Sequence, residues 1–233
     1  MCPPNIARFI ASIGDLLYSN NEDTLFIHHF MACKVESTCF NGEVSEIVQE
    51  TNYPLDGAIT FTIKSSGIKK MAFRIPNWCE SYSFKLNGNE VAVKIKNGYA
   101  YISRLAEETD VIHINYQMNC QLIETSPEAQ ENSGRVALQR GPILYCLEAI
   151  DNGHLLRDIR IHGSGQYEVI KDAYFGAPII KTMGYHRNPE HFKNQLYKPL
   201  TEKLEKINLT FIPYYGFANR GESEMVVWVL GKS

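Results

Sequence analysis

The sequence predicts a mainly β protein, with two antiparallel, jelly-roll-like β-sandwich domains preceded by one N-terminal α-helix. Three observations support this fold class. Apolar residues repeat with a helical period over residues 5–19, and after residue 20 the period changes to two. Turn residues then recur at intervals of about eight to twelve residues, as in sandwiches and barrels. A polar stretch over 125–134 divides the β-rich part into two blocks.

The predicted helix covers residues 5–19. Pro3 and Pro4 precede it and suit a helix entry, where a missing N–H costs nothing. Its apolar residues recur at steps of three and four and form one wide stripe. They are Ile6, Phe9, Ile10, Ile13, Leu16 and Leu17. A stripe of this width needs a large apolar partner.

The first β-rich block is predicted over residues 21–125. Its clearest elements are two tight hairpins, whose turns are Asn87-Gly88 and Asn97-Gly98. Asn-Gly supplies the positive φ values of a type I′ turn, whose twist matches the strands that it joins. Further strands are predicted at 25–30, 32–35, 43–51, 58–64, 71–75 and 110–116.

The second block is predicted over residues 126–233. Its strands are expected at 136–140, 143–149, 159–162, 167–170, 178–182, 207–213 and 224–230. Residues 184–198 are polar and have no clean period, which indicates a long loop. The last two strands are predicted to pair with each other through a turn at 219–222.

The composition excludes several classes of protein. The chain has 233 residues, a formal net charge of −3 and 44% hydrophobic residues, which fits one or two globular domains. Proteins that bind nucleic acid carry clustered basic residues, and this chain is slightly acidic, so no nucleic-acid partner is expected. No apolar run reaches the roughly 18 residues of a membrane span. We therefore expect a soluble protein, cytoplasmic or periplasmic.

The histidines do not form an obvious metal site. His28 and His29 are adjacent, and adjacent side chains of a strand point to opposite faces, so one is expected to be buried and the other exposed. His186 and His191 could meet on a loop, but no thiol or carboxylate is placed to complete a site with them.

The acidic pairs Glu46 with Glu50 and Glu107 with Glu108 suggest the two carboxylates of a glycoside hydrolase. Glu107 and Glu108 lie in a Glu-Glu-Thr-Asp turn, which favours solvated surface instead. The cysteines show neither zinc-ribbon spacing nor the density of a disulfide scaffold. All of them except Cys2 are expected to be free, mostly buried thiols.

Aromatic side chains crowd the second block. They are Tyr185, Phe192, Tyr197, Tyr214, Tyr215, Phe217 and Trp228. Aromatic faces stack on sugar rings, so a carbohydrate-binding platform is one interpretation. The aromatic core of a β-sandwich is the other.

Cys2 stands just before the predicted helix. At that position the helix dipole favours a thiolate, which is both a nucleophile and a zinc ligand. Zinc normally takes four ligands, so Cys2 alone makes no zinc site.

Six stretches carry a resemblance to a known family. Residues 2–12 (CPPNIARFIAS) are similar to the Cys-Cys-Pro-Pro-Asn-x-x-Arg-x-x-Ala-Ser segment of the β-L-arabinofuranosidases of glycoside hydrolase family 127. The others are 49–54 (QETNYP), 74–78 (RIPNW), 134–142 (GRVALQRGP), 212–215 (IPYY) and 218–221 (ANRG). They follow the family's order, and the match covers only the family's C-terminal part.

The resemblance implies a domain organisation. Proteins of this family have an N-terminal (α/α)₆ barrel that carries the active site, followed by two β-sandwich domains. Residues 1–20 are then expected to be the last helix of that barrel, 21–125 the middle sandwich and 126–233 the C-terminal sandwich. The expected partner of this chain is therefore the missing catalytic barrel.

The resemblance also implies the chemistry of the parent enzyme. It releases β-L-arabinofuranose from plant-type, arabinose-containing glycans by a retaining mechanism with a zinc-bound cysteine nucleophile. The family's paired cysteines fall at positions 1 and 2, and position 1 is Met1, whose thioether cannot form a thiolate. Only Cys2 carries over, as a zinc ligand, because the other ligands and the acid/base Glu lie upstream. This chain alone is expected to have no catalytic residue, to hold no zinc and to be inactive.

Two alternative functions stay open. The aromatic second block suggests a stand-alone carbohydrate-binding module. A purely structural module is the other, with Ile6, Phe9, Ile10 and Ile13 as its contact stripe. In that case the chain should oligomerise or bury the stripe against its own sheets, because an exposed apolar patch is adhesive.

Overall fold

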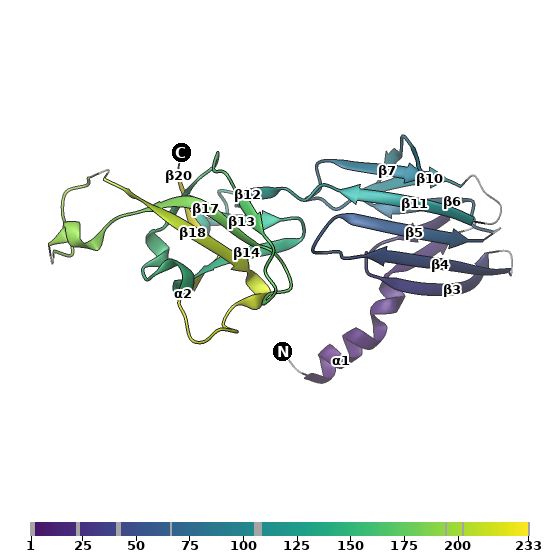
Figure 1. Ribbon diagram of the computed structural model, residues 1–233, viewed down its shortest axis with the longest axis horizontal. Coiled ribbons are helices and arrows are strands. Elements are labelled where there is room, and N and C mark those ends of the chain that lie inside the picture. Colours follow the sequence, from purple (N-terminus) through teal and green to yellow (C-terminus); the bar gives the residue numbers. More distant parts are fainter. Residues whose placement is uncertain are drawn as a thin grey trace. The chain divides into compact units, whose positions relative to one another are not determined.

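The structure is a computed structural model and describes residues 3–21, 24–40, 43–65, 67–104, 109–193, 195–201 and 203–232. The chain divides into two compact units, Met1–Met118 and Asn119–Ser233, and Figure 1 labels their elements. The division falls before the boundary expected at residues 125 and 126, because β12 (Cys120–Glu124) pairs with a strand of the second unit, β13 (Arg135–Arg140). No helix in the described ranges has both the length and the apolar character needed to cross a membrane.

The first unit begins with helix α1 (Pro3–Ser12), which continues into a single 3₁₀ segment, η1 (Ile13–Leu16). The helix is shorter than the predicted 5–19. Gly14 disfavours α-helix, and β1 (Tyr18–Asn21) starts directly after Leu17. Leu17 is buried, whereas every residue of α1 is exposed, and α1 extends away from the strands of its unit (Figure 1).

Two sheets make up the rest of the first unit. Their strand orders are β1-β2-β6-β10-β9 and β3-β4-β5-β11-β7-β8. The strands are β2 (Thr24–Ile27), β3 (Cys33–Phe40), β4 (Glu43–Thr51), β5 (Ala58–Lys64), β6 (Lys70–Arg74), β7 (Tyr82–Leu86), β8 (Asn89–Glu90), β9 (Lys94–Lys96), β10 (Tyr99–Ser103) and β11 (Thr109–Tyr116). The described strands of these sheets pair antiparallel, as predicted, except that β2 and β6 run parallel.

The two sheets enclose one hydrophobic core. Ile59, Phe61 and Ile63 of β5 alternate into it from the six-stranded sheet, as expected of a strand with one buried face. Met71 and Phe73 of β6 enter it from the five-stranded sheet. The rings of Phe61 and Phe73 meet edge to face, with centroids 5.1 Å apart. The first unit is therefore a two-sheet sandwich.

Both predicted Asn-Gly turns are confirmed. Asn87 and Gly88 have φ values of 50° and 84°, and Asn97 and Gly98 have φ values of 51° and 77°. These are the positive φ values of a type I′ turn. The turns join β7 to β8 and β9 to β10.

The second unit contains a ring of six strands, which corrects the prediction of a second sandwich. The ring runs β13-β20-β15-β17-β18-β14 and returns to β13. It closes because β13 bridges both ends of the sheet: Arg135 and Ala137 pair with β20, and Gln139 and Arg140 pair with β14. In addition, β15 and β20 run parallel.

The remaining bounds of the second unit are as follows. Its strands are β14 (Ile143–Glu148), β15 (Arg160–His162), β16 (Glu168–Ile170), β17 (Ile179–His186), β18 (Glu205–Pro213), β19 (Met225–Val226) and β20 (Trp228–Lys232). Its helical turns are η2 (Gln130–Asn132), α2 (Ala149–Asn152), η3 (Leu156–Asp158), η4 (Pro189–Phe192) and η5 (Tyr214–Gly216). Its core includes Leu138, Tyr145, Ile180, Phe211 and Val229.

The last strands do not pair as predicted. β18 pairs with β17 and β14, while β20 pairs with β13 and β15. The segment predicted as their hairpin turn, 219–222, instead belongs to a loop that Arg220 ties to Glu148 of β14. The predicted loop at 184–198 also starts later, because β17 continues to His186.

Candidate functional site

The predicted zinc ligand, Cys2, lies outside the described residues, directly before the first residue of α1. Four other cysteines, Cys33, Cys79, Cys120 and Cys146, are free thiols. Burial raises the pKa of the Cys79 and Cys120 thiols, and it raises the pKa of Cys146 to about 12. These three thiols are therefore protonated at neutral pH, as expected of structural rather than metal-binding cysteines.

The described residues bring together no group of three or more His, Cys, Asp or Glu side chains that could hold a metal ion. His28 is half-buried and His29 exposed. The His28 ring lies between the hydroxyls of Ser19 and Tyr99, at 2.7 Å from each. His191 lies 3.5 Å from Glu205. His28 and His191 are thus engaged by neighbouring protein groups.

Among the acidic pairs singled out in the sequence, Glu46 is engaged by two lysines. Glu46 lies between Lys34 and Lys64, at 2.6 Å and 2.9 Å from their Nζ atoms. Their hydrogen bonds lower the pKa of Glu46 to about 2, so this carboxylate cannot donate a proton at neutral pH. Glu107 and Glu108 lie outside the described residues.

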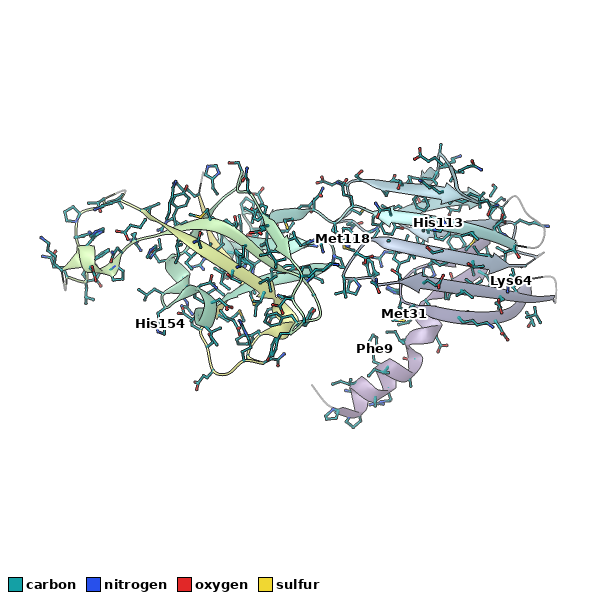
Figure 2. All side chains as sticks on the ribbon, in the orientation of Figure 1. Phe9, Met31, Lys64, His113, Met118 and His154 are labelled. Atoms are coloured by element: carbon teal, nitrogen blue, oxygen red, sulfur yellow. The ribbon has the colours of Figure 1, made fainter. Side chains whose placement is uncertain are left out.

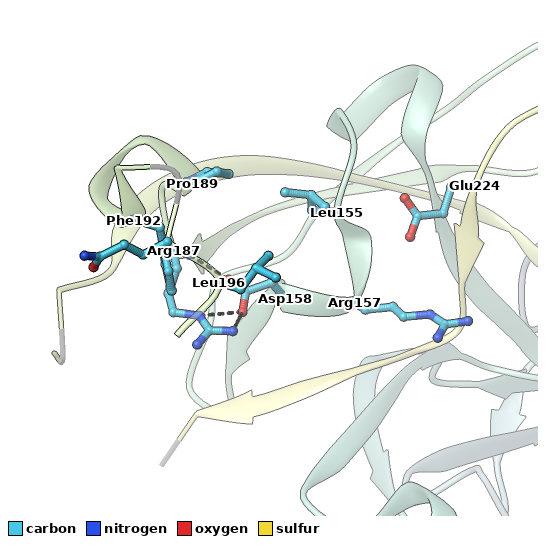
Figure 3. Close-up of a pocket in the computed structure, with 9 residues that line it drawn as sticks. Leu155, Arg157, Asp158, Arg187, Pro189, Phe192, Leu196 and Glu224 are labelled. Atoms are coloured by element: carbon cyan, nitrogen blue, oxygen red, sulfur yellow. Dashed lines mark hydrogen bonds and ion pairs between the residues drawn. The ribbon is translucent and has the colours of Figure 1, made fainter. Parts of the chain in front are cut away.

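One pocket of about 510 Å³ lies in the second unit, where η3 meets the loop after β17 (Figure 3). Leu155, Pro189, Phe192 and Leu196 supply apolar walls. Two acidic residues, Asp158 and Glu224, also line it. Asp158 accepts hydrogen bonds from Arg187, whose Nε lies 2.8 Å from Oδ1 and whose backbone N lies 2.7 Å from Oδ2.

The Asp158 carboxylate serves the architecture of this pocket. Burial raises the pKa of Asp158, but the hydrogen bonds from Arg187 and Arg160 outweigh burial and hold the pKa below its usual value. The Phe192 ring lies beneath Lys198, whose Nζ is 4.3 Å from the ring centroid. Asp158 is therefore a charged anchor for the loop and not a general acid.

The apolar stripe of α1 is a surface without a partner in the described part of the chain. Phe9 is 56% exposed and Ile10 is 63% exposed, and Ile6 and Leu16 are exposed as well. Figure 2 labels Phe9 among the side chains of α1. The stripe is therefore not buried against the chain's own sheets, the arrangement that we considered for a purely structural module.

Exposed aromatic side chains form a second surface, in the second unit. Among the aromatic candidates from the sequence, Tyr214, Tyr215 and Phe217 lie exposed on one loop. Sequence reasoning missed Tyr174 and Phe175, which hold that loop in place. An available signal was Asp172, whose side chain accepts hydrogen bonds from the backbone N–H groups of Tyr174 and Phe175, because Asp commonly nucleates such turns.

Known families match both units. Residues 24–118 match the model described as "Beta-L-arabinofuranosidase, GH127 middle domain". Residues 120–230 match the model described as "Glycoside hydrolase family 127 C-terminal domain". Together these models cover most of the chain.

Individual relatives agree with the family models. The non-reducing end β-L-arabinofuranosidase of Bifidobacterium longum subsp. longum is 27% identical over 242 residues, which cover 97% of this chain and 36% of that protein. The crystal structure of a GH127 β-L-arabinofuranosidase from Geobacillus stearothermophilus T6 matches with a TM-score of 0.93 and 37% identity, over 99% of this chain and 37% of that one. A further GH127 β-arabinofuranosidase structure matches with a TM-score of 0.84 and 28% identity, over 99% of this chain and 38% of that one.

This chain therefore spans little more than a third of the length of these relatives. Both of its units match domains of one family, in the family's own order. The chain belongs to glycoside hydrolase family 127.

Proposed function

We propose that this chain is the non-catalytic C-terminal region of a β-L-arabinofuranosidase-like glycoside hydrolase, and that it packs against and supports a catalytic (α/α)₆ barrel. In this proposal residues 1–20 complete the barrel as its last helix, and the two units are the middle and C-terminal domains. The matched models are named for a middle and a C-terminal domain, which supports a preceding domain in the parent.

The observation that carries the proposal is the exposed stripe of α1. A helix with one apolar face is stable when that face is buried. Burial of apolar surface contributes about 25 cal/mol per Å², so Phe9 and Ile10 leave a sizeable stabilisation unused in this chain. A barrel that receives this face supplies the missing partner.

The chemistry of the parent is part of the proposal. The parent releases β-L-arabinofuranose from arabinose-containing glycans by a retaining mechanism, with a zinc-bound cysteine nucleophile. Cys2 supplies one zinc ligand. The described residues do not complete a zinc site. We therefore assign the other zinc ligands to the barrel, and we assign no catalytic step to the described residues.

A first experiment tests inactivity. The purified chain is incubated with a chromogenic β-L-arabinofuranoside, beside a Cys2→Ala variant. We expect the same background from both. Turnover by the unmodified chain above that of the variant would contradict the proposal.

A second experiment tests the helix. In a chimera, this chain replaces the matching 37% of the Geobacillus stearothermophilus enzyme, and thermal unfolding and arabinofuranosidase activity are measured. Phe9→Ser with Ile10→Ser should lower the melting temperature of the chimera, because the stripe then loses its apolar contact. The control is Arg8→Ser with Ala11→Ser, which places serine on the face of α1 opposite the stripe. Equal melting temperatures for the two double variants, or an unfolded parent chimera, would overturn the proposal.

A further inference from the structure

Two loops of the second unit present aromatic rings to solvent. They comprise residues 172–176 and 214–221, and we call them the aromatic double loop. Tyr174 is 60% exposed and Tyr215 is 57% exposed, and Tyr214 and Phe217 are exposed beside Tyr215 in the sequence. Several large exposed rings on neighbouring loops are typical of an interaction surface.

Reciprocal hydrogen bonds join the two loops. The Tyr174 hydroxyl of the first loop donates to the backbone carbonyl of Asn219 in the second, at 2.8 Å. The Tyr215 hydroxyl of the second loop donates to the carbonyl of Phe175 in the first, at 2.9 Å. Each exposed ring is thus fixed at its far end by the other loop.

The space between the loops is closely packed. The Phe175 ring lies against Gly216, where an added Cβ would come within 2.5 Å of the ring. The guanidinium carbon of Arg220 lies 5.1 Å from the centroid of the same ring. Arg220 in turn binds Glu148 and Asp151. Tyr174 and Tyr215 are therefore held in place before any partner arrives, which lowers the entropy cost of binding.

The chemistry of the surface favours protein over sugar. A sugar ring carries hydroxyls around its edge and needs hydrogen-bonding groups beside the aromatic face. Here the Tyr174 and Tyr215 hydroxyls donate to backbone carbonyls, and the Arg220 guanidinium is paired with carboxylates. What these rings offer is mainly carbon surface, which suits the core of a protein interface.

We propose that the aromatic double loop is the surface through which the C-terminal domain docks onto the domain that precedes the middle domain in full-length GH127 proteins. The inference rests on the function proposed above. The chain spans 37% of the Geobacillus stearothermophilus relative, so most of the length of such a protein is available to cover these rings. Tyrosine and phenylalanine are enriched in interfaces of this kind.

The test compares the chimera with the isolated chain. Tyr214→Ser with Phe217→Ser removes two exposed rings and leaves the hydrogen bonds between the loops intact. We expect the melting temperature of the chimera to fall by at least about 3 °C more than that of the isolated chain. The control is Leu196→Ser with Tyr197→Ser, at sites that are 87% and 90% exposed on another loop. This double variant should leave the melting temperatures of both the chimera and the isolated chain unchanged.

Hydrogen exchange gives an independent readout. Backbone amides of residues 214–221 should exchange at least about tenfold more slowly in the chimera than in the isolated chain, because a docked interface protects them. Equal exchange in the two proteins, or equal thermal shifts, would overturn the inference. Two other results would also overturn it. One is a dimer of the isolated chain that becomes monomeric in the variant Tyr214→Ser with Phe217→Ser. The other is a shift of the tyrosine NMR signals on addition of arabinose-containing oligosaccharides at millimolar concentration.

The outcomes also separate this inference from the proposed function. If serine at Phe9 and Ile10 destabilises the chimera while serine at Tyr214 and Phe217 does not, the proposed function stands and the docking surface is wrong. If the chimera without substitutions fails to fold, both the proposed function and the docking surface are wrong.

Discussion

Arg220 donates a hydrogen bond of 2.6 Å to the carboxylate of Glu148, whose side chain is only 1% exposed. The other Glu148 oxygen accepts a hydrogen bond from the backbone N–H of Ala218, at 2.8 Å. One buried carboxylate at the end of β14 therefore fixes both a side chain and the backbone of the loop at 214–221. A buried charge of this kind is tolerated only when it is paired and hydrogen-bonded.

Glu148→Ala should destabilise the second unit by about 3 to 5 kcal/mol, because it leaves the Arg220 guanidinium without its buried partner. Each unit holds one tryptophan, Trp78 in the first and Trp228 in the second. In a Trp78→Phe background, fluorescence during urea unfolding therefore reports the second unit alone.

Asp151→Asn is the matched control for Glu148→Ala, because Asp151 binds the same guanidinium from a more exposed position. Asp151→Asn should lower the unfolding free energy of the second unit by clearly less than Glu148→Ala does. Equal losses for the two variants would contradict a special role for the buried carboxylate.

Gly216→Ala should disturb the contact between the two aromatic loops. The new Cβ would lie 2.5 Å and 2.8 Å from two carbons of the Phe175 ring, and overpacking of this kind costs about 1 to 3 kcal/mol. Gly163→Ala is the control in the same unit, because nothing lies within 4 Å of its added Cβ. The Trp228 signal should show a loss of stability for Gly216→Ala only, and a similar loss for both would refute this account.

Local and distant interactions differ in how well the sequence predicts them. The turns at Asn87-Gly88 and Asn97-Gly98 depend on two adjacent residues, and both form as predicted. The loop at 214–221 depends on Glu148 and Arg220, which are 72 residues apart. The residues around Arg220 in the sequence do not indicate Glu148 as its partner, so the local pattern predicted a hairpin turn instead.

Strand partners pose the same difficulty. The alternation of β5 shows that one face is buried, but it does not show which strand lies beside it. The closed ring of the second unit depends on β13 pairing with β20 and β14 along different halves of its length. A sandwich and a barrel therefore give similar sequence patterns.

The candidate site divides in the same way. The helical period predicted the apolar stripe of α1, and the structure shows that stripe exposed at Phe9 and Ile10. The role of Cys2 stays a prediction from the family resemblance.

Breaking a buried ion pair should destabilise the first unit. Arg104 Nε lies 2.9 Å from Asp110 Oδ2, and the two side chains are 2% and 0% exposed. Asp110 also accepts a hydrogen bond from Asn87 at 2.7 Å, and Arg104 donates to the backbone carbonyl of Ser65 at 2.5 Å. Asp110→Ala should therefore cost about 3 to 5 kcal/mol of unfolding free energy.

Trp78 fluorescence in a Trp228→Phe background measures the cost of Asp110→Ala. Lys64→Ala removes a 60% exposed side chain that pairs with Glu46 and is the control, with little expected change, because ion pairs of exposed side chains contribute little. A loss for Asp110→Ala no larger than that for Lys64→Ala would show that the buried pair is dispensable.

His28 should make the first unit sensitive to mild acid. Burial lowers the pKa of His28, and the positive charges of His29 and Arg74 lower it further. In the unfolded chain a histidine takes up its proton near pH 6.5, whereas the folded chain does so only at lower pH. Below about pH 6.5 the unfolded state therefore binds more protons, and stability falls until the pH reaches the folded pKa. Above pH 6.5 this residue gives no pH dependence.

His28→Gln should flatten the decline of stability between pH 6.5 and the folded pKa, because glutamine does not titrate. The measurement is urea unfolding followed through Trp78 at a series of pH values, in the Trp228→Phe background. NMR titration of the His28 ring gives the folded pKa directly, and the expected value lies below 6.5. Protonation costs the ring its acceptor role toward Ser19 or Tyr99, each 2.7 Å away. A ring that titrates at or above pH 6.5 would contradict this prediction, as would an unchanged pH profile in His28→Gln.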